Sequence, residues 1–506
     1  MRSNAIRRIT ALALTLLLAP VGSSPVCSAA ENDGKTALPA QYDGREFGYV
    51  TPIRDQGQFE TCWCFGTMAS IEAYMVKHGI RDSSTGAPAD LSLDLSESQL
   101  AWFSYTKAYD KLGLLEGDET IPEENYLMQA STNAMITYTL MRGAGPASES
   151  EKALAYRKKK QKGLDARYAY ANNVAAVTDV TWIPAADRDA VKRAVMEYGA
   201  GSIAYHHDFA CMDMYSEDRT CGYYCGGATE PNHLVCIVGW DDNFPRENFD
   251  ENYRPEYDGA WLIKNSWGSE LLLDGYFYLS YEECSANVGA VSFYKVEDLH
   301  SSRRCYQYDG TSNCISTCSM GNQCQIANIF TAAGTEQLQS VALAVKDQNT
   351  SYTLSIYQNP SSETEPDSGT LVQTQSGVLP FGGYHNIPLD TAVPLKQGDT
   401  FSVVFTLSTP EATEDGSYVH IPYDASAENV KEPDMENPVS WVHTDHGNSS
   451  FYREANGGWT DCPDKGDFRI KAYTDSFGAL VAEQSLPIWK MLNAEVTRLL
   501  SCLLGR

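Results

Sequence analysis

The periodicity of apolar residues changes near residue 304, and this change constrains the fold more than any other feature of the sequence. Between 38 and 300, helical and strand patterns alternate: apolar side chains recur at helical spacing from Phe65 to Met75, and 234–238 is a short apolar run of the buried-strand kind. From 304 to 475, short strand-like runs follow one another, separated by polar turns. We therefore expect an α+β domain followed by an all-β sandwich.

The chain has 506 residues, which is too long for one small domain and favours two or three. Arg303-Arg304 marks the expected junction. Because the periodicity changes abruptly there, we predict that the two domains fold independently. After the sandwich, residues 476–506 carry apolar side chains at helical spacing on either side of Pro487. They predict a helical tail to which we assign no role.

The N-terminus has the pattern of an export signal. A basic start with three arginines is followed by an apolar run over 9–21 and by small residues at 28–30. The apolar run is too short to span a bilayer. We predict a signal peptide over 1–30, a short propeptide or linker over 31–37, and a location outside the cell, either free or associated with the cell surface.

The chain is strongly acidic. Its 66 Asp and Glu residues outnumber its 38 Lys and Arg residues, which gives a formal net charge of −28. Binding to phosphates requires clustered Lys and Arg, so this balance excludes nucleic acid and anionic membranes as main partners. It leaves the attraction of cationic partners open. We predict no nucleic-acid partner and no membrane span.

The 14 cysteines divide by their surroundings. Cys64 in the predicted helix and Cys236 in a predicted strand are expected to be core thiols. The others of interest lie in loops rich in Gly, Ser and Asn: Cys211, Cys221, Cys225, Cys305, Cys314, Cys318 and Cys324. Export permits disulfides, which we expect here, with zinc as a minor alternative. The spacing does not determine which cysteines pair.

Two groups of histidines invite a metal interpretation. They are His206-His207 and the pair His443 and His446. Neither group has a matching pattern of carboxylates or cysteines around it. We therefore expect exposed loop histidines, and we predict no metal and no cofactor.

The residues with the clearest chemical meaning surround Cys62. This thiol stands at the start of the predicted helix, where the helix dipole favours the reactive thiolate, and Thr61 can cap that helix. A cysteine nucleophile needs an imidazole nearby and a group that orients the imidazole. His233, which leads into a predicted strand, and Asn265, which follows another, offer both.

These segments closely resemble the papain-like cysteine peptidases. The matching motifs, in the family's order, are Gln56-Gly57, Cys62-Trp63, Asn232-His233-Leu234 and Asn265-Ser266-Trp267-Gly268. Over 38–300 the resemblance implies a two-lobed fold with a helical lobe and a β lobe. It also implies that Cys62 is the nucleophile, His233 the general base and Asn265 the orienting group. Gln56 and the backbone N–H of Cys62 would hold the oxyanion, and substrate contacts would come from Glu60, Trp63, Asn232, Leu234 and Trp267.

The sequence departs from the family in three ways. Phe59-Glu60 replaces the usual Cys-Gly before the nucleophile, which removes one familiar disulfide and alters the cleft edge. His233 and Asn265 follow Cys62 by 171 and 203 residues, beyond the roughly 130–150 of well-known members. We expect the additional residues to lie between 103 and 170. The glycine pair that lines the family's substrate cleft has no counterpart that we can identify.

The second domain, 304–475, resembles the lectin-like β-sandwich attached to some secreted microbial papain-like peptidases. The similarity lies in 306–309, 327–332, 383–385 and 466–472. It implies a carbohydrate or cell-surface ligand. The whole pattern favours a secreted cysteine endopeptidase acting on proteins or peptides. Two alternatives are a surface adhesin with a peptidase-fold scaffold and an amidase or transpeptidase of cell-wall peptides.

Overall fold

The computed structural model describes residues 37–122, 126–159, 161–213, 220–227, 230–312, 316–410, 418–430, 439–454 and 457–476. The predicted signal peptide, the linker up to residue 36 and the tail after 476 lie outside these residues, and their assignments stay predictions. The described residues from Ala40 onward belong to one compact unit. Within the described part of the chain, no helix is long and apolar enough to cross a membrane.

Most helices of the first domain begin and end at capping residues. The α-helices are α1 (Cys62–His78), α2 (Glu97–Ser104), α3 (Asn133–Met141), α4 (Arg188–Tyr198) and α5 (Cys284–Asn287). Ser96 and Thr132 cap α2 and α3 through side-chain oxygens that accept backbone N–H groups. α1 ends at Gly79, whose φ of 62° suits glycine. The prediction that Thr61 caps α1 is wrong, because its hydroxyl instead bonds the hydroxyl of Tyr156 at 2.8 Å.

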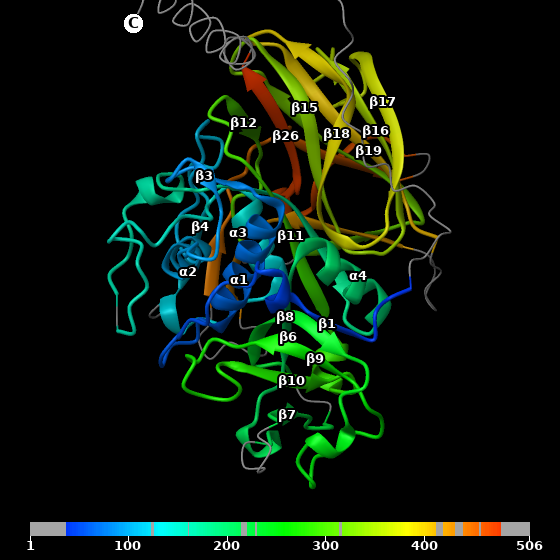
Figure 1. Ribbon diagram of the computed structural model, residues 1–506. Coiled ribbons are helices and arrows are strands. Elements are labelled where there is room, and N and C mark those ends of the chain that lie inside the picture. Colours follow the sequence, from blue (N-terminus) through cyan, green and yellow to red (C-terminus); the bar gives the residue numbers. More distant parts are fainter. Residues whose placement is uncertain are drawn as a thin grey trace, which may run out of the picture. The chain divides into compact units, whose positions relative to one another are not determined.

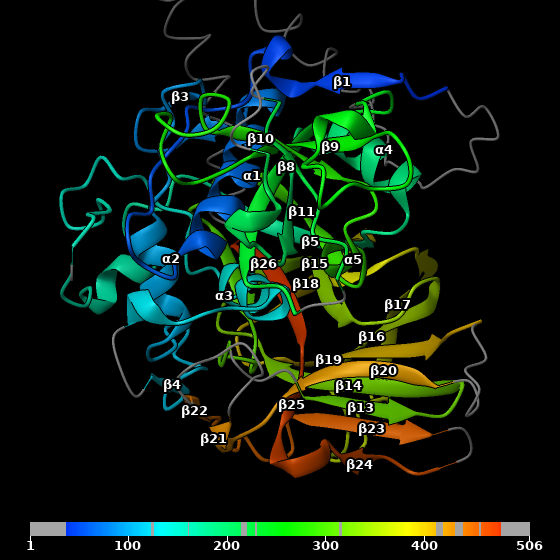
Figure 2. The ribbon, with the colours of Figure 1, turned by 90° about the horizontal axis from the view of Figure 1, so that it is seen from below.

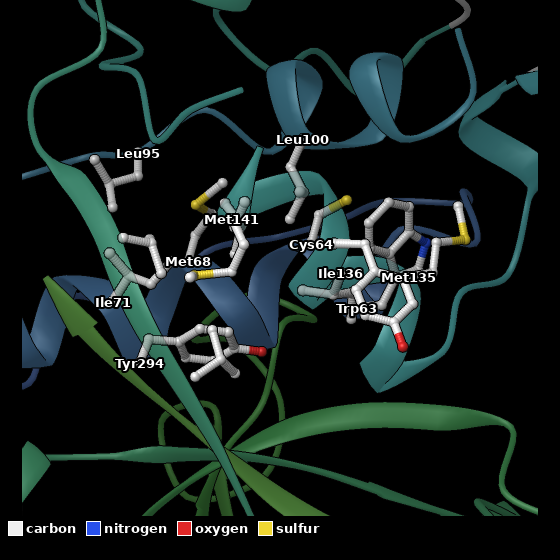
Figure 3. Packing of buried hydrophobic residues seen from close by; sticks show 14 of the residues in the cluster. Trp63, Cys64, Met68, Ile71, Leu95, Leu100, Met135, Ile136, Met141 and Tyr294 are labelled. Atoms are coloured by element: carbon white, nitrogen blue, oxygen red, sulfur yellow. The ribbon is translucent and has the colours of Figure 1, made fainter. Parts of the chain in front are cut away.

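The helices pack through a core that Figure 3 shows from close by. Trp63, Cys64, Met68 and Ile71 of α1 lie toward Leu100 of α2 and toward Ile136 and Met141 of α3. Cys64 is fully buried there, which confirms that it is a core thiol. On its other side, α1 lies against a strand at Gly66, where any side chain would overlap Leu234. This close approach brings the start of α1 next to His233.

One large sheet runs through both domains. Its order is β12-β26-β15-β18-β5-β11-β6-β8-β9-β10-β7, with β1 beside β8. The strands are β1 (Gln41–Asp43), β5 (Ala176–Pro184), β6 (Gly201–Tyr205), β7 (Gly222–Tyr223), β8 (His233–Asp241), β9 (Ala260–Lys264), β10 (Tyr276–Ser280), β11 (Ala290–Glu297), β12 (Arg303–Tyr306), β15 (Glu336–Val345), β18 (Gly382–Leu395) and β26 (Ile470–Ser476). Figure 1 shows β15, β18 and β26 on one side of the helices and β6, β8, β9 and β10 on the other.

The second domain is the predicted β-sandwich. Its other main sheet has the order β17-β16-β19-β14-β23-β24, seen together in Figure 2. These strands are β14 (Gln323–Thr331), β16 (Thr350–Gln358), β17 (Thr370–Leu379), β19 (Thr400–Ser408), β23 (Ser450–Glu454) and β24 (Thr460–Asp461). Its core joins Ile326 and Phe405 of this sheet with Leu343 and Ile470 of the large one. A smaller sheet, β13 (Thr317–Met320), β20 (Val419–Asp424) and β25 (Asp467–Phe468), completes the domain.

The two domains share both a sheet and a core, which the sequence did not predict. β18 pairs with β5 through Gly382–Tyr384 against Val180–Trp182. Ala342, Ala344 and Tyr384 of the sandwich belong to the same hydrophobic cluster as the start of α1. The structure therefore argues against independent folding of the two domains.

A segment of the first domain also joins the sandwich directly. β4 (Glu119–Pro122) pairs with β22 (Val439–Val442), which in turn pairs with β21 (Ala427–Val430). Leu112 and Leu114 pack against the sandwich core. The same segment continues into the 3-10 turn Tyr126–Met128 and the cleft wall described below.

His443 and His446 contradict the expectation of exposed loop histidines, because their side chains are only 1% and 13% exposed. Both rings bond the same oxygen of Asp467, at 2.9 and 2.8 Å. Nδ1 of His443 lies 3.4 Å from Asp118 and 3.5 Å from Asp424. Burial alone would lower the pKa of His443, but these carboxylates raise it to about 11. The result is a buried imidazolium among carboxylates from both domains.

Candidate active site

The predicted nucleophile lies at the N-terminus of α1, as expected. Cys62 is the first residue of the helix and is 9% exposed. The backbone N–H of Leu234 bonds its sulfur, as do the N–H groups at the start of the helix. With His233 it lines a cavity of 570 Å³. Its sulfur is thus surrounded by donors that can stabilise a negative charge.

His233 and Asn265 form the predicted orienting pair. Nε2 of His233 lies 2.8 Å from Oδ1 of Asn265. An amide oxygen can only accept, so Nε2 carries the proton and Nδ1 is the nitrogen left to accept one. Ser266 N–H donates to the same Oδ1 at 2.9 Å, which fixes the amide. The Trp267 ring stacks on His233 with centroids 4.7 Å apart and thereby shields the pair from solvent.

Gln56, the predicted oxyanion residue, is held in place by three hydrogen bonds. Its Oε1 accepts the Ser266 hydroxyl at 2.6 Å, and its Nε2 donates to the carbonyl of Phe59 at 2.8 Å. Its backbone N–H donates to Ser266 O at 2.8 Å. A side-chain amide has two N–H bonds on nitrogen, so one remains for a developing oxyanion.

Burial acts on the two reacting groups in opposite directions. It raises the pKa of Cys62 to about 11, although the Leu234 N–H lowers it in part. It lowers the pKa of His233 to about 4, against the opposing effect of the Asn265 hydrogen bond. Each shift taken alone favours the neutral form. A thiolate–imidazolium pair therefore requires that the two charges stabilise each other at short range.

The predicted substrate contacts lie in different surroundings. Glu60 is exposed at the cavity, while Leu234 is 5% exposed beneath it. Trp63 lines the cavity but is only 2% exposed, and its Nε1 donates to Gln129 O at 3.0 Å. The side chain of Asn232 bonds the backbone of His207. Trp267, described above, lies outside the cavity lining.

Part of the cavity wall comes from the segment that reaches the sandwich. Met128, Ala130, Ser131 and Thr132 line the cavity. Backbone contacts fix this wall to the nucleophile loop, because Glu60 N–H donates to Leu127 O at 3.0 Å.

Two residues near the site, Tyr156 and Phe209, have no counterpart in the sequence predictions, and His207, expected to be an exposed loop histidine, is instead partly buried. The Tyr156 hydroxyl lies 2.8 Å from the carbonyl of Gln56 and from the Thr61 hydroxyl, and so braces the loop that carries Gln56. His207 and Phe209 pack beside Trp267. None belongs to a local motif, so spacing along the chain could not reveal them.

The predicted disulfides are found in part. Cys211 pairs with Cys225, and this bridge lies at the edge of the site. Cys305, Cys318 and Cys324 form no disulfide within the described residues, which corrects the expectation for these three. Cys314 lies outside those residues. Cys236 is fully buried in β8, as predicted.

Among the residues that the structure describes, two groups of side chains could hold an ion, and both lie around His443. One consists of His443, His446 and Asp467, the other of Asp118, Asp424 and His443, with ligand atoms within 4.8 Å of one another. The backbone N–H groups of Gly310, Thr311 and Thr444 already donate to Asp118 and Asp424. The imidazolium network accounts for this cluster without an ion.

Comparisons with known proteins agree with the geometry. Residues 38–98 and 132–296 match the papain family cysteine proteases, and 305–474 match the lectin like domain. The first domain belongs to the papain family. The chain thus joins a papain-family cysteine protease domain to a lectin-like domain. The family match skips 99–131, which falls largely in the region predicted to hold the excess residues.

Solved structures extend the similarity across both domains. The chain is 25% identical to the cysteine protease and lectin-like domains of Cwp84, a surface layer associated protein of Clostridium difficile. That match has a TM-score of 0.69 and covers 87% of this chain and 90% of the other. A structure of Cwp84 after propeptide cleavage matches with a TM-score of 0.68, covering 86% of this chain and 99% of the other. The predicted α+β peptidase fold followed by a β-rich domain is confirmed.

The curated relatives cover about half of the chain. Testin-2 of Rattus norvegicus is 27% identical over 243 residues, or 48% of this chain and 61% of its own length. Cathepsin K of Gallus gallus is 25% identical over 252 residues, or 49% of this chain and 60% of its own length. The chain thus spans about three fifths of the length of these relatives.

Proposed function

We propose that this protein is a cysteine endopeptidase that cleaves proteins or peptides through Cys62, His233, Asn265 and Gln56. The observation that carries the proposal is the 2.8 Å bond between His233 Nε2 and Asn265 Oδ1 under Trp267, beside a cysteine at a helix N-terminus. This arrangement leaves Nδ1 of His233 as the base for the thiol.

The reaction follows from the placement of these groups. His233 Nδ1 takes the proton of Cys62, and the sulfur attacks the scissile carbonyl carbon. The carbonyl electron pair moves to the oxygen, which accepts hydrogen bonds from the Cys62 backbone N–H and the free N–H of Gln56. Such a hole contributes about 3–4 kcal/mol in analogous enzymes. The C–N bond then breaks, and His233 returns its proton to the leaving amine.

Water completes the cycle. It attacks the acyl–sulfur bond while His233 takes one of its protons, and the carboxylic acid product leaves as the thiol is restored. Every step uses side chains and backbone groups of this chain. Asn265 keeps the imidazole in one tautomer throughout, because its oxygen accepts only from Nε2–H.

Substitution of the two neighbouring thiols tests the proposal. Cys62→Ser should abolish peptidase activity and leave the melting temperature unchanged, because the nucleophile is lost while the volume is nearly kept. Cys64→Ser is the matched control and should remain active, since that thiol lies in the core. Equal loss of activity in both variants would contradict the assignment of Cys62.

We also propose that the protein acts outside the cell or on its surface. The predicted export signal supports this, and so does the similarity to Cwp84, whose structure is described as that of a surface layer associated protein. The lectin-like domain would bind a carbohydrate or another cell-surface ligand, as its resemblance implies. Detection of the mature protein in culture supernatant or cell-wall fractions tests the location.

A further inference from the structure

A second cavity lies where the peptidase domain meets the sandwich. It has a volume of 160 Å³, and of the residues that the structure describes none lines both this cavity and the active-site cavity. Arg142 and Tyr170 of the first domain contribute to its wall, and so does Tyr473 of β26. Residues 298–300, in the connection between β11 and β12, line it as well. We name this space the junction cavity.

The charge around the junction cavity is opposite in sign to that of the whole chain. The described lining residues include four basic ones, Lys111, Arg142, Arg303 and Arg304, and two acidic ones, Asp110 and Asp298. Both carboxylates already accept backbone N–H groups, Asp110 those of Leu112, Leu114 and Leu115 and Asp298 that of Arg81. In a chain with 66 acidic and 38 basic residues, this local excess of positive charge favours an anion.

Arg142 supplies a buried donor that has no hydrogen-bond partner. The residue is 3% exposed. Its Nη1 donates to Gly310 O at 2.5 Å and to Ser312 Oγ at 3.2 Å, and its Nη2 donates to Phe103 O, so the guanidinium is fixed in place. Its Nε is buried and bonds no acceptor. Because a buried donor without an acceptor is costly, an acceptor in the cavity would be stabilised there. The carboxylates of Asp118, Asp424 and Asp309 also act on this guanidinium, but none of them bonds Nε.

Two further basic side chains are able to bind an anion in the junction cavity. Arg303 pairs with Glu297 through Nη1 at 3.2 Å, but its Nε is buried without a partner, as in Arg142. Lys111 is exposed at the cavity. Arg304 is already paired with the buried carboxylate of Glu336 at 3.0 Å, so we assign it no ligand. The cavity thus offers two unsatisfied guanidinium N–H groups and one ammonium.

The remaining wall of the junction cavity limits the size and the polarity of a ligand. Apolar and aromatic side chains line it, namely Tyr170, Ala175, Val177, Leu299 and Tyr473. An engineered cavity of about 150 Å³ holds benzene, so a volume of 160 Å³ admits a body of about one ring. An apolar wall with a few polar groups that fix orientation is typical of small-molecule sites.

We propose that the junction cavity binds a small organic anion, a carboxylate on an apolar body about the size of one ring, through Arg142 and Arg303. Lys111 adds to the attraction for the negative charge. Because the wall includes the connection between β11 and β12, the bound anion stabilises the junction of the two domains. This site does not depend on the proposed peptidase function, since the active-site cavity has other lining residues.

The test compares acids with their neutral amides as ligands of the full chain. Benzoate and isovalerate are titrated by calorimetry at low ionic strength beside benzamide and isovaleramide, which have nearly the same shape. At least one acid should bind saturably at one site, about tenfold or more tightly than its amide, and should raise the melting temperature. Acids that bind no better than their amides, or no saturable binding of either acid, would overturn the proposal. Inorganic phosphate that binds more tightly than both acids would overturn the role of the apolar wall.

Two variants locate the binding site. Arg142→Lys keeps the buried charge and removes the Nε donor, and Arg303→Gln removes the other guanidinium. Each should weaken binding of the acid about tenfold, and Arg303→Gln should keep wild-type peptidase activity because it lies outside the active-site cavity. Lys465→Gln is the control, because Lys465 is 80% exposed and is not among the residues that line the cavity, so the affinity should not change.

Arg303→Gln decides the outcome if Arg142→Lys lowers the melting temperature of the free protein. Unchanged affinity for the acid in Arg303→Gln, or an equal loss in Lys465→Gln, would overturn the site. Loss of acid binding in Arg303→Gln with wild-type cleavage of a peptide would support it and leave the peptidase assignment untouched.

Discussion

Replacing Asn265 by alanine isolates the orienting step from the chemistry itself. The substitution removes the oxygen that accepts His233 Nε2–H at 2.8 Å in a site where the histidine is 7% exposed. A buried donor without a partner costs about 1–3 kcal/mol. If the His233 imidazole then leaves its reactive orientation, this cost adds to the activation free energy of the reaction. kcat/KM then falls about 5- to 150-fold.

His233→Ala provides the reference against which the loss of activity in Asn265→Ala is compared. That variant loses the base altogether, and general-base catalysis contributes about 10²- to 10⁴-fold. Both variants should be assayed with one peptide at saturating and limiting concentrations, with melting temperatures recorded beside the kinetics. We expect Asn265→Ala to be the milder of the two. Equal losses in the two variants, or wild-type kinetics in Asn265→Ala, would refute the orienting role.

Three further predictions concern the domain junction and the cleft edge. Truncation after residue 300 removes β18 from β5 and Tyr384 from the core beneath α1, so circular dichroism and activity should show a poorly folded, inactive fragment. The pKa of His443 in the folded protein, about 11, lies above its unfolded value near 6.5. The network around His443 therefore stabilises the folded state fully below about pH 6.5, and this stabilisation is lost as the pH rises toward 11. Urea midpoints that fall from pH 6 to pH 10 in the wild type and not in His443→Gln would bear this out, and equal slopes would contradict it. If the exposed Glu60 carboxylate pairs with a basic side chain of the substrate, the wild type should prefer Arg or Lys before the cut. Glu60→Gln should then reduce this preference by at most about fivefold at low ionic strength, and an unchanged cleavage profile would exclude this role of Glu60.

The catalytic residues could be predicted because their signals are local. Cys62 begins a helix, His233 begins a strand and Asn265 follows one, so short motifs at element ends specify the chemistry. The structure brings these three segments together as the resemblance implied. The change of periodicity near residue 304 likewise predicted a β-rich second domain, and the family match begins at 305.

The relation between the domains could not be predicted in this way. The pairing of Gly382–Tyr384 with Val180–Trp182 joins strands about 200 residues apart, and no local pattern records which edge a strand will meet. The same holds for His443, whose carboxylate partners come from positions 118, 424 and 467. Sequence spacing predicted loop histidines because the partners are distant along the chain.

A competing side-chain hydrogen bond explains why the predicted helix cap at Thr61 is wrong. Thr61 has a residue type suited to capping, but the Tyr156 hydroxyl lies within 2.8 Å and occupies its oxygen. Phe209 is similar in kind: its turn ends at Cys211, whose disulfide with Cys225 the spacing of the cysteines did not determine. Both positions depend on tertiary contacts that the local sequence does not contain.

Labelling with a thiol-reactive peptidyl epoxide shows whether Cys62 is the nucleophile. The full chain is incubated with the epoxide, digested and analysed by mass spectrometry while residual peptidase activity is measured in parallel. We expect one adduct, on Cys62, that grows in proportion to the loss of activity and is absent from Cys62→Ser but present in Cys64→Ser. Loss of activity with the adduct on another cysteine, or full activity with Cys62 modified, would contradict it.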